Sequence, residues 1–125
     1  MSVETIPNNT STYITFDSED YDDNNYWTVG SPTRLTVTDT GRYLFGATVV
    51  FDSNATGSRG MAIEANRDGG TEVMDTRAVP QSSHGGSIIG QEELAATNYI
   101  ELRVVQNSGG NLDVLWARFW ITRIG

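Results

Sequence analysis

Apolar and polar residues alternate with a period of two along most of the chain, which is the pattern of β-strands. In the clearest run, residues 43–51, one face carries Tyr43, Phe45, Ala47, Val49 and Phe51, and the other carries Leu44, Gly46, Thr48 and Val50. The sequence Asp39-Thr40-Gly41 lies between this run and residues 34–38, so it predicts a turn and a β-hairpin. No segment keeps the helical period of about 3.6 residues, and the pattern therefore predicts an all-β domain.

The other alternating runs are short, and clusters of glycine, asparagine, aspartate and serine separate them. Met61, Ile63 and Ala65 mark one such run, and further strands are predicted at 87–91 and 99–106. Turn-forming clusters stand at 52–57, 66–70 and 107–111. About eight to ten short antiparallel strands with such turns predict a β-sandwich or jelly roll.

The C-terminal segment, residues 111–125, carries large apolar side chains on both alternating faces. One face is Leu112, Val114, Trp116, Trp120 and Ile124, and the other is Leu115, Ala117, Phe119 and Ile121. An outer strand of an antiparallel sheet normally has one polar face, so two apolar faces predict that another layer or another subunit covers the second one. The alternative is the central strand of a monomeric sandwich with one tryptophan partly exposed.

The N-terminal segment has a different composition from the rest. Residues 1–12 are mostly polar and predict a flexible N-terminal arm, whereas residues 13–125 have the length of one domain. Val3, Ile6 and Pro7 are the apolar points of this arm. They are too few to fold alone, but they suit an extended strand that docks against the sheet edge of a neighbouring molecule. The segment has neither a basic start nor an apolar core, so we expect no signal peptide.

Composition narrows the classes of function. The net charge is −8, from 16 acidic residues against 8 basic ones, and every basic residue is arginine. Such an acidic chain is poorly suited to bind nucleic acid or an anionic membrane. It has no cysteine, which excludes disulfides and thiolate metal sites, and no apolar run long enough for a transmembrane helix.

Candidate chemistry is sparse. The single histidine, His84, lies in a Gly- and Ser-rich stretch without the motif of a nucleophile or a zinc site, so we expect no enzymatic activity. Asp20, Asp22 and Asn24 have the i, i+2, i+4 spacing that opens a calcium loop. Asn25 replaces the glycine, and Ser31 the glutamate, that such a loop requires later. The segment is therefore either a solvated acidic loop or a weak calcium site, and no other cofactor is expected.

Several motifs together resemble the globular domain of complement component 1q and tumour necrosis factor. They are Tyr21-Asp22, residues 32–46, residues 61–66, residues 99–104 and the closing sequence Trp116-Ala-Arg-Phe-Trp-Ile121. Thr97-Asn98 replaces the Gly-Asp that the family usually has before its penultimate strand. The resemblance implies an antiparallel jelly-roll β-sandwich of about ten strands that forms a homotrimer. Trp116, Phe119 and Trp120 are the expected trimer interface.

The sequence looks most similar to versions of this domain in virion proteins of tailed viruses of bacteria and archaea. It therefore predicts a structural protein, a homotrimeric decoration or turret protein on the capsid surface, made in the host cytoplasm. Its partners would be itself and the major capsid protein, which Val3, Ile6 and Pro7 would help to dock. One alternative is the tip protein of a tail fibre or spike, in which Tyr26 and Trp27 would hold a host-surface glycan or protein. A second is a secreted adhesin.

Overall fold

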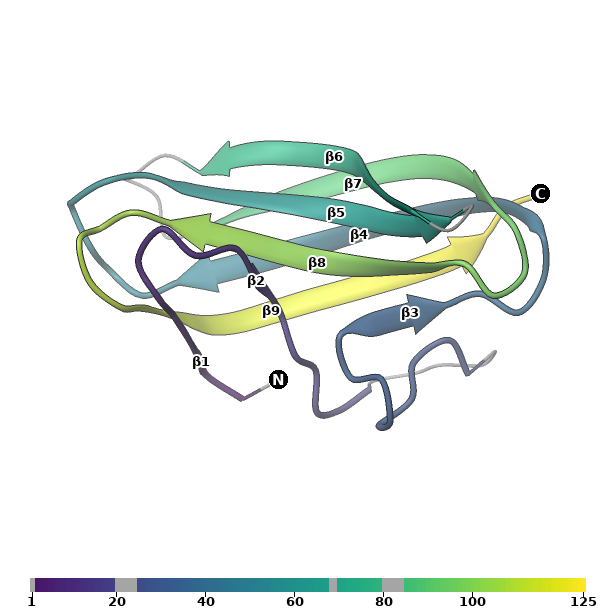
Figure 1. The fold of residues 1–125 in the computed structure, drawn as a ribbon, viewed down its shortest axis with the longest axis horizontal. Coiled ribbons are helices and arrows are strands. Elements are labelled where there is room, and N and C mark those ends of the chain that lie inside the picture. Colours follow the sequence, from purple (N-terminus) through teal and green to yellow (C-terminus); the bar gives the residue numbers. More distant parts are fainter. Residues whose placement is uncertain (1, 20–24, 68–69, 80–84) are drawn as a thin grey trace.

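The computed structural model describes residues 2–19, 25–67, 70–79 and 85–125, with the backbone alone for 74–79. Within these ranges the chain forms nine antiparallel strands in two facing sheets and no helix (Figure 1). The strands are β1 (Glu4–Ile6), β2 (Thr12–Tyr13), β3 (Arg34–Thr36), β4 (Gly41–Phe51), β5 (Arg59–Arg67), β6 (Gly70–Val79), β7 (Gly85–Leu94), β8 (Tyr99–Gln106) and β9 (Leu112–Arg123). The all-β prediction is confirmed.

Each sheet combines strands that lie far apart in the sequence. The four-stranded sheet has the order β1-β9-β4-β7, and the second sheet has the order β2-β8-β5-β6, with β3 also pairing to β8. The chain crosses repeatedly from one sheet to the other, because consecutive long strands such as β4 and β5 lie in different sheets. This is the connectivity of a jelly roll, in which two sheets enclose one core.

The core lies between the sheets and contains the inward residues of each alternating strand. On β4 the side chains of Tyr43, Phe45 and Phe51 are fully buried, as the alternation predicts. From the second sheet, Ile63 of β5 and Leu102 of β8 are fully buried as well. Burying each such side chain contributes roughly 1.5–3 kcal/mol, so hydrophobic packing between the sheets stabilises the fold in a chain without disulfides.

Strand β9 contains a bulge that changes which of its side chains share a face. Val114 is opposite Phe51 and Trp116 is opposite Val50, so Leu115 is an extra residue in the ladder. The sequence alternation placed Trp116 and Trp120 with Leu112 and Val114. The structure corrects this, because an extra residue exchanges the two faces for the rest of the strand. Ala117, Phe119 and Ile121 continue the inward face of Val114, and the tryptophans point outward.

The N-terminal segment is part of the sandwich, which differs from the flexible arm expected for residues 1–12. Strand β1 pairs with residues 112–114 of β9, and β2 pairs with β8 (Figure 1). Ile6 is fully buried, and its carbonyl accepts a 2.9 Å hydrogen bond from Gln106 Nε2. Val3 and Pro7 remain exposed. One isoleucine in a polar run gives little periodic signal, so the sequence pattern does not predict strand β1. Its residue Ile6 nevertheless fills a site in the core.

Candidate self-association surface

The outward side of the four-stranded sheet carries a group of apolar residues that we call the tryptophan face. Cross-strand pairing brings them together: Gly46 of β4 lies between Trp120 of β9 and Ile89 of β7, and Val50 of β4 pairs with Trp116 of β9. The tryptophan face consists of Leu44, Gly46, Val50, Ile89, Trp116 and Trp120. Three strands therefore contribute to one surface, because the bulge in β9 places both tryptophans on the outward side.

Gly46 allows Trp120 to lie against the sheet. A Cβ atom at Gly46 would lie 2.5 Å from Cζ2 and 2.7 Å from Cε2 of Trp120, and 2.9 Å from the carbonyl oxygen of Ile88. These separations are too short for any side chain, so only glycine leaves room for the indole ring. The ring therefore covers the middle of β4, and Trp120 is half-buried within its own protomer.

The tryptophan face leaves large apolar groups in contact with solvent. Ile89 is 60% exposed and Trp116 is 45% exposed, and the bulged Leu115 beside Trp116 is 42% exposed. Polar groups are interspersed, including Arg118 and the pair Thr48 and Ser87, whose hydroxyls are 2.8 Å apart. A cluster of exposed apolar side chains on one face is typical of a surface that associates with another protein.

The outward side of the second sheet is polar and charged by contrast. Tyr13 donates a 2.8 Å hydrogen bond to Glu64 Oε2, and Arg103 Nε is 3.3 Å from Glu64 Oε1. The hydrogen bond to the Glu64 carboxylate raises the pKa of the Tyr13 hydroxyl. On the same side the guanidinium of Arg34 lies 4.0 Å from the centre of the Tyr99 ring. Charged groups paired in this way suit a face that remains in water.

The structure separates the three residues that the sequence indicated as a trimer interface. Trp116 and Trp120 lie together on the tryptophan face. Phe119 points between the sheets, where its ring stacks on Phe16 with centroids 5.8 Å apart and an angle of 25°. Sequence analysis did not identify Gly46 and Ile89 as parts of this surface. The alternation of residues within each strand separates the two sides of that strand. Only the pairing of β4 with β7 and β9 shows that Gly46 and Ile89 adjoin Trp120.

The other residues indicated by the sequence form no site in the described part of the chain. Asp20, Asp22 and Asn24 lie outside the described residues, as does His84. Among the described residues, no group of three or more His, Cys, Asp or Glu side chains is placed to hold a metal ion. Tyr26 is buried, and Trp27 Nε1 donates a 3.1 Å hydrogen bond to the carbonyl of Pro32. These two aromatic residues help to close one edge of the sandwich.

A cluster of ion pairs connects the two sheets at another edge. Arg67 of β5 is 2.7 Å from Glu72 of β6 and 3.4 Å from Glu92 of β7, and it donates a 3.0 Å hydrogen bond to the carbonyl of Glu93. The hydrogen bond with Glu72 raises the pKa of the Arg67 guanidinium. These contacts hold β5 and β6 of one sheet to β7 of the other.

No helix that is long and apolar enough to cross a membrane occurs in the ranges that the structure describes.

Two facing antiparallel sheets in this strand order form a jelly-roll sandwich, and comparison with solved structures shows the fold of the complement component 1q and tumour necrosis factor domains. Murine APRIL at pH 5.0 has a TM-score of 0.59 and 17% identity over 98% of each chain. The globular domain of zebrafish complement 1qA has a TM-score of 0.56 and 12% identity, covering 100% of this chain and 98% of that one. Eiger TNF from S. frugiperda has a TM-score of 0.51 and 12% identity, covering 99% and 92%.

The comparisons with solved structures establish the fold of the chain. No protein-family model matches the sequence, and no curated protein matches it either. At identities of 12–17% the shared feature is the arrangement of the two sheets. The function must therefore be argued from the surfaces of this chain.

Proposed function

We propose that this protein is a non-enzymatic structural protein that forms a homotrimer through the tryptophan face and decorates the capsid of a tailed virus. The exposure of both Trp116 and Ile89, on the sheet face that also carries the half-buried Trp120, is the observation that carries the proposal. Closed association of three copies would remove these side chains from water. The paired charges of the opposite sheet would stay on the outside of the assembly.

The role on a virion rests on the resemblance of the sequence to jelly rolls in virion proteins, and the partner would be the major capsid protein. Because Ile6 is buried in its own protomer, only the exposed part of the N-terminal segment is available for docking. Val3, which is 57% exposed, and Pro7 are the candidates. They lie on either side of Ile6 and would contact the shell without unfolding the sandwich.

Sedimentation tests the trimer. At micromolar concentration the protein should sediment with about three times the 13.7 kDa mass of one chain. Ile89→Glu should dissociate it, because a carboxylate would be buried in the interface. Val105→Glu is the matched control, since Val105 is 39% exposed on the outward side of the second sheet. A monomeric parent protein, or equal effects of the two substitutions, would contradict association through the tryptophan face.

Addition of the purified trimer to undecorated capsids tests the virion role. The trimer should bind to shells at high and saturable copy number, and Val3→Glu should weaken this binding while leaving the trimer intact. Absence of binding to shells would contradict decoration. Saturable binding to host cells together with a low copy number confined to the tail would instead support a receptor-binding tip protein.

A further inference from the structure

Three loops meet at one end of the sandwich, the end opposite the C-terminus (Figure 1). They contain residues 7–11 between β1 and β2, residues 53–58 between β4 and β5, and residues 107–111 between β8 and β9, and we call these residues the loop end. The loop end consists only of Pro, Asn, Thr, Ser, Ala and Gly, although 19% of the residues in the chain are charged. The flanking Asp52 adjoins β4 and Asp113 belongs to β9, so this uncharged surface has acidic residues only at its border.

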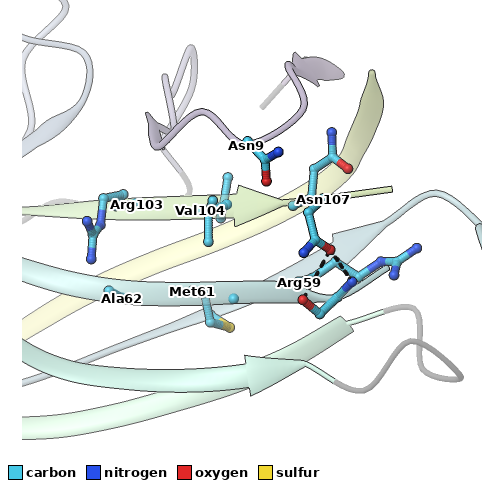
Figure 2. Close-up of a pocket in the computed structure, with 11 residues that line it drawn as sticks. Asn9, Arg59, Met61, Ala62, Arg103, Val104 and Asn107 are labelled. Carbon is cyan, nitrogen blue, oxygen red and sulfur yellow. Dashed lines mark hydrogen bonds between the residues drawn. The ribbon is translucent and has the colours of Figure 1, made fainter. Parts of the chain in front are cut away.

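Hydrogen bonds join the three loops to one another. The Gly109 amide donates a 2.9 Å hydrogen bond to the carboxamide oxygen of Asn8. The Asn107 carboxamide oxygen accepts hydrogen bonds from the Ser58 amide and, at 3.1 Å, from the Ser58 hydroxyl (Figure 2). The loop after β8 is therefore bonded to both of the other loops, and the loop end behaves as one unit.

Two buried polar side chains hold the loop end from within the sandwich. Gln106 is 1% exposed, and its Nε2 donates a 2.7 Å hydrogen bond to the Gly110 carbonyl. Arg59 is 3% exposed, and its guanidinium donates hydrogen bonds to the carbonyls of Asn54 and, at 3.2 Å, of Thr56. Burial of such groups is unfavourable unless their hydrogen bonds are made. Because these bonds are made to loop carbonyls, the two side chains fix the shape of the loop end.

A rigid and uncharged surface is well suited to docking. Loops that are already ordered lose little conformational entropy when a partner binds. Amides and hydroxyls are also less costly to remove from water than charged groups, and Ser, Asn and Gly provide adaptable hydrogen bonds in protein-binding loops. The opposite end of β5 differs, because Arg67 forms ion pairs there with Glu72 and Glu92.

We propose that the loop end is the surface that docks onto an acidic protein surface of the capsid shell, an inference that rests on the proposed function. Each chain carries a net charge of −8, so most of its surface would repel an acidic partner, and close approach is favoured where charges are absent. A basic partner would instead bind to the acidic faces. Pro7, already a candidate for docking, belongs to the loop end, and a closed trimer would present three copies of it.

One added charge at each of two open glycines tests the proposal. Gly110 lies in the loop end, whereas Gly70 pairs with Arg67 at the other end of β5, and no atom lies within 4 Å of a Cβ built at either. Both Gly110→Glu and Gly70→Glu should remain trimeric in sedimentation. Gly110→Glu should weaken binding to undecorated capsids by about tenfold or more, because its carboxylate would face an acidic surface. Gly70→Glu, the matched control, should bind as the parent protein does.

Thr56→Glu, at an exposed position of the loop after β4, repeats the test if Gly110→Glu does not fold. Unchanged binding of a folded loop-end variant, or an equal loss in Gly70→Glu, would overturn this inference and leave capsid decoration standing. Dissociation of the trimer by a loop-end charge would place these loops in the subunit interface and would overturn it as well. A parent trimer that does not bind shells would overturn both proposals.

The salt dependence of binding identifies the charge of the partner surface. Raising sodium chloride from about 0.05 M to 0.5 M screens charges at the contact. Binding of the parent trimer to shells should stay constant or strengthen, because an uncharged end meets an acidic surface and only repulsion is screened. A loss of about tenfold or more over this range would show that attraction between opposite charges holds the complex. The acidic faces would then be the docking surface, and the assignment to the loop end would be wrong.

Discussion

At the scale of single residues, Gly46 decides whether Trp120 can lie on its sheet. Gly46→Ala would place a Cβ 2.9 Å from the backbone oxygen of Ile88, which cannot move aside as a flexible side chain could. We expect a loss of about 1–3 kcal/mol in the free energy of unfolding and displacement of the indole ring. Urea denaturation and tryptophan fluorescence measure the two effects. Gly30→Ala is the control, because no atom lies within 4 Å of a Cβ built there.

Tyr43 should make the free energy of unfolding decrease at alkaline pH. Burial and a hydrogen bond with Tyr26 raise the pKa of the Tyr43 hydroxyl, which also donates a 2.6 Å hydrogen bond to the Asp39 carbonyl. A pKa raised in the folded state gives stability that is fully present below the unfolded value of about 10 and is lost as pH rises through the folded value.

Urea denaturation between about pH 7 and pH 11 checks this dependence. The free energy of unfolding should fall as pH rises above about 10, and Tyr43→Phe should fall less steeply while losing about 1 kcal/mol at neutral pH with its hydrogen bond. Tyr99→Phe controls for the removal of a tyrosine hydroxyl from the partly exposed Tyr99. Identical slopes for the parent protein and Tyr43→Phe would show that other groups cause the alkaline loss.

At the scale of elements, alternation identified strands but could not establish register. The inward set Tyr43, Phe45 and Phe51 was evident from the sequence, because β4 is regular over its full length. In β9 the extra residue Leu115 exchanges the faces, and a bulge depends on the pairing of two strands rather than on one sequence. The grouping of Trp116 with Val114 was therefore wrong. The grouping of Trp116 with Trp120 was right because no bulge lies between them.

Strand β1 shows that a short strand without an alternating sequence pattern can contribute a residue to the core. Ile6→Ala should lower the free energy of unfolding by about 2–5 kcal/mol, because Ile6 is fully buried between the sheets and its loss leaves a cavity. Val3→Ala, at a position 57% exposed, should change it little. Thermal and chemical denaturation of the two variants measure the difference. Equal, small effects would show that the N-terminal segment contributes nothing to the core in solution.

At the scale of the whole molecule, composition and turn residues were sufficient for the fold class but not for the surfaces. Short alternating runs and turn-forming clusters predicted a β-sandwich or jelly roll, and the family resemblance implied the jelly roll, which the strand order and the structural comparisons confirm. The position of Ile89 beside Trp120 was not predictable, because it depends on the rows that β4 forms with β7 and β9. Function on a β-sheet surface is defined by neighbours across strands, and these are fixed only when the sheets form.

The net charge gives a prediction for the assembled protein. Each chain carries −8, so three copies carry 3 × −8 = −24, and like charges on one assembly repel unless salt screens them. Raising sodium chloride from about 0.01 M to 1 M shortens the screening length from about 30 Å to 3 Å. The melting temperature of the proposed trimer should therefore rise with salt. A melting temperature that is independent of salt, or falls with it, would show that repulsion does not limit the assembly.

A comparison of calcium with sodium chloride distinguishes charge screening from specific binding of a cation. If Asp20, Asp22 and Asn24 bind a cation through their oxygen atoms, millimolar calcium should raise the melting temperature more than sodium chloride of equal ionic strength. Asp22→Asn should remove that excess, whereas Asp52→Asn, in an exposed turn after β4, should retain it. Equal shifts with the two salts would leave screening as the whole effect. The acidic segment would then contribute to stability through its charge alone.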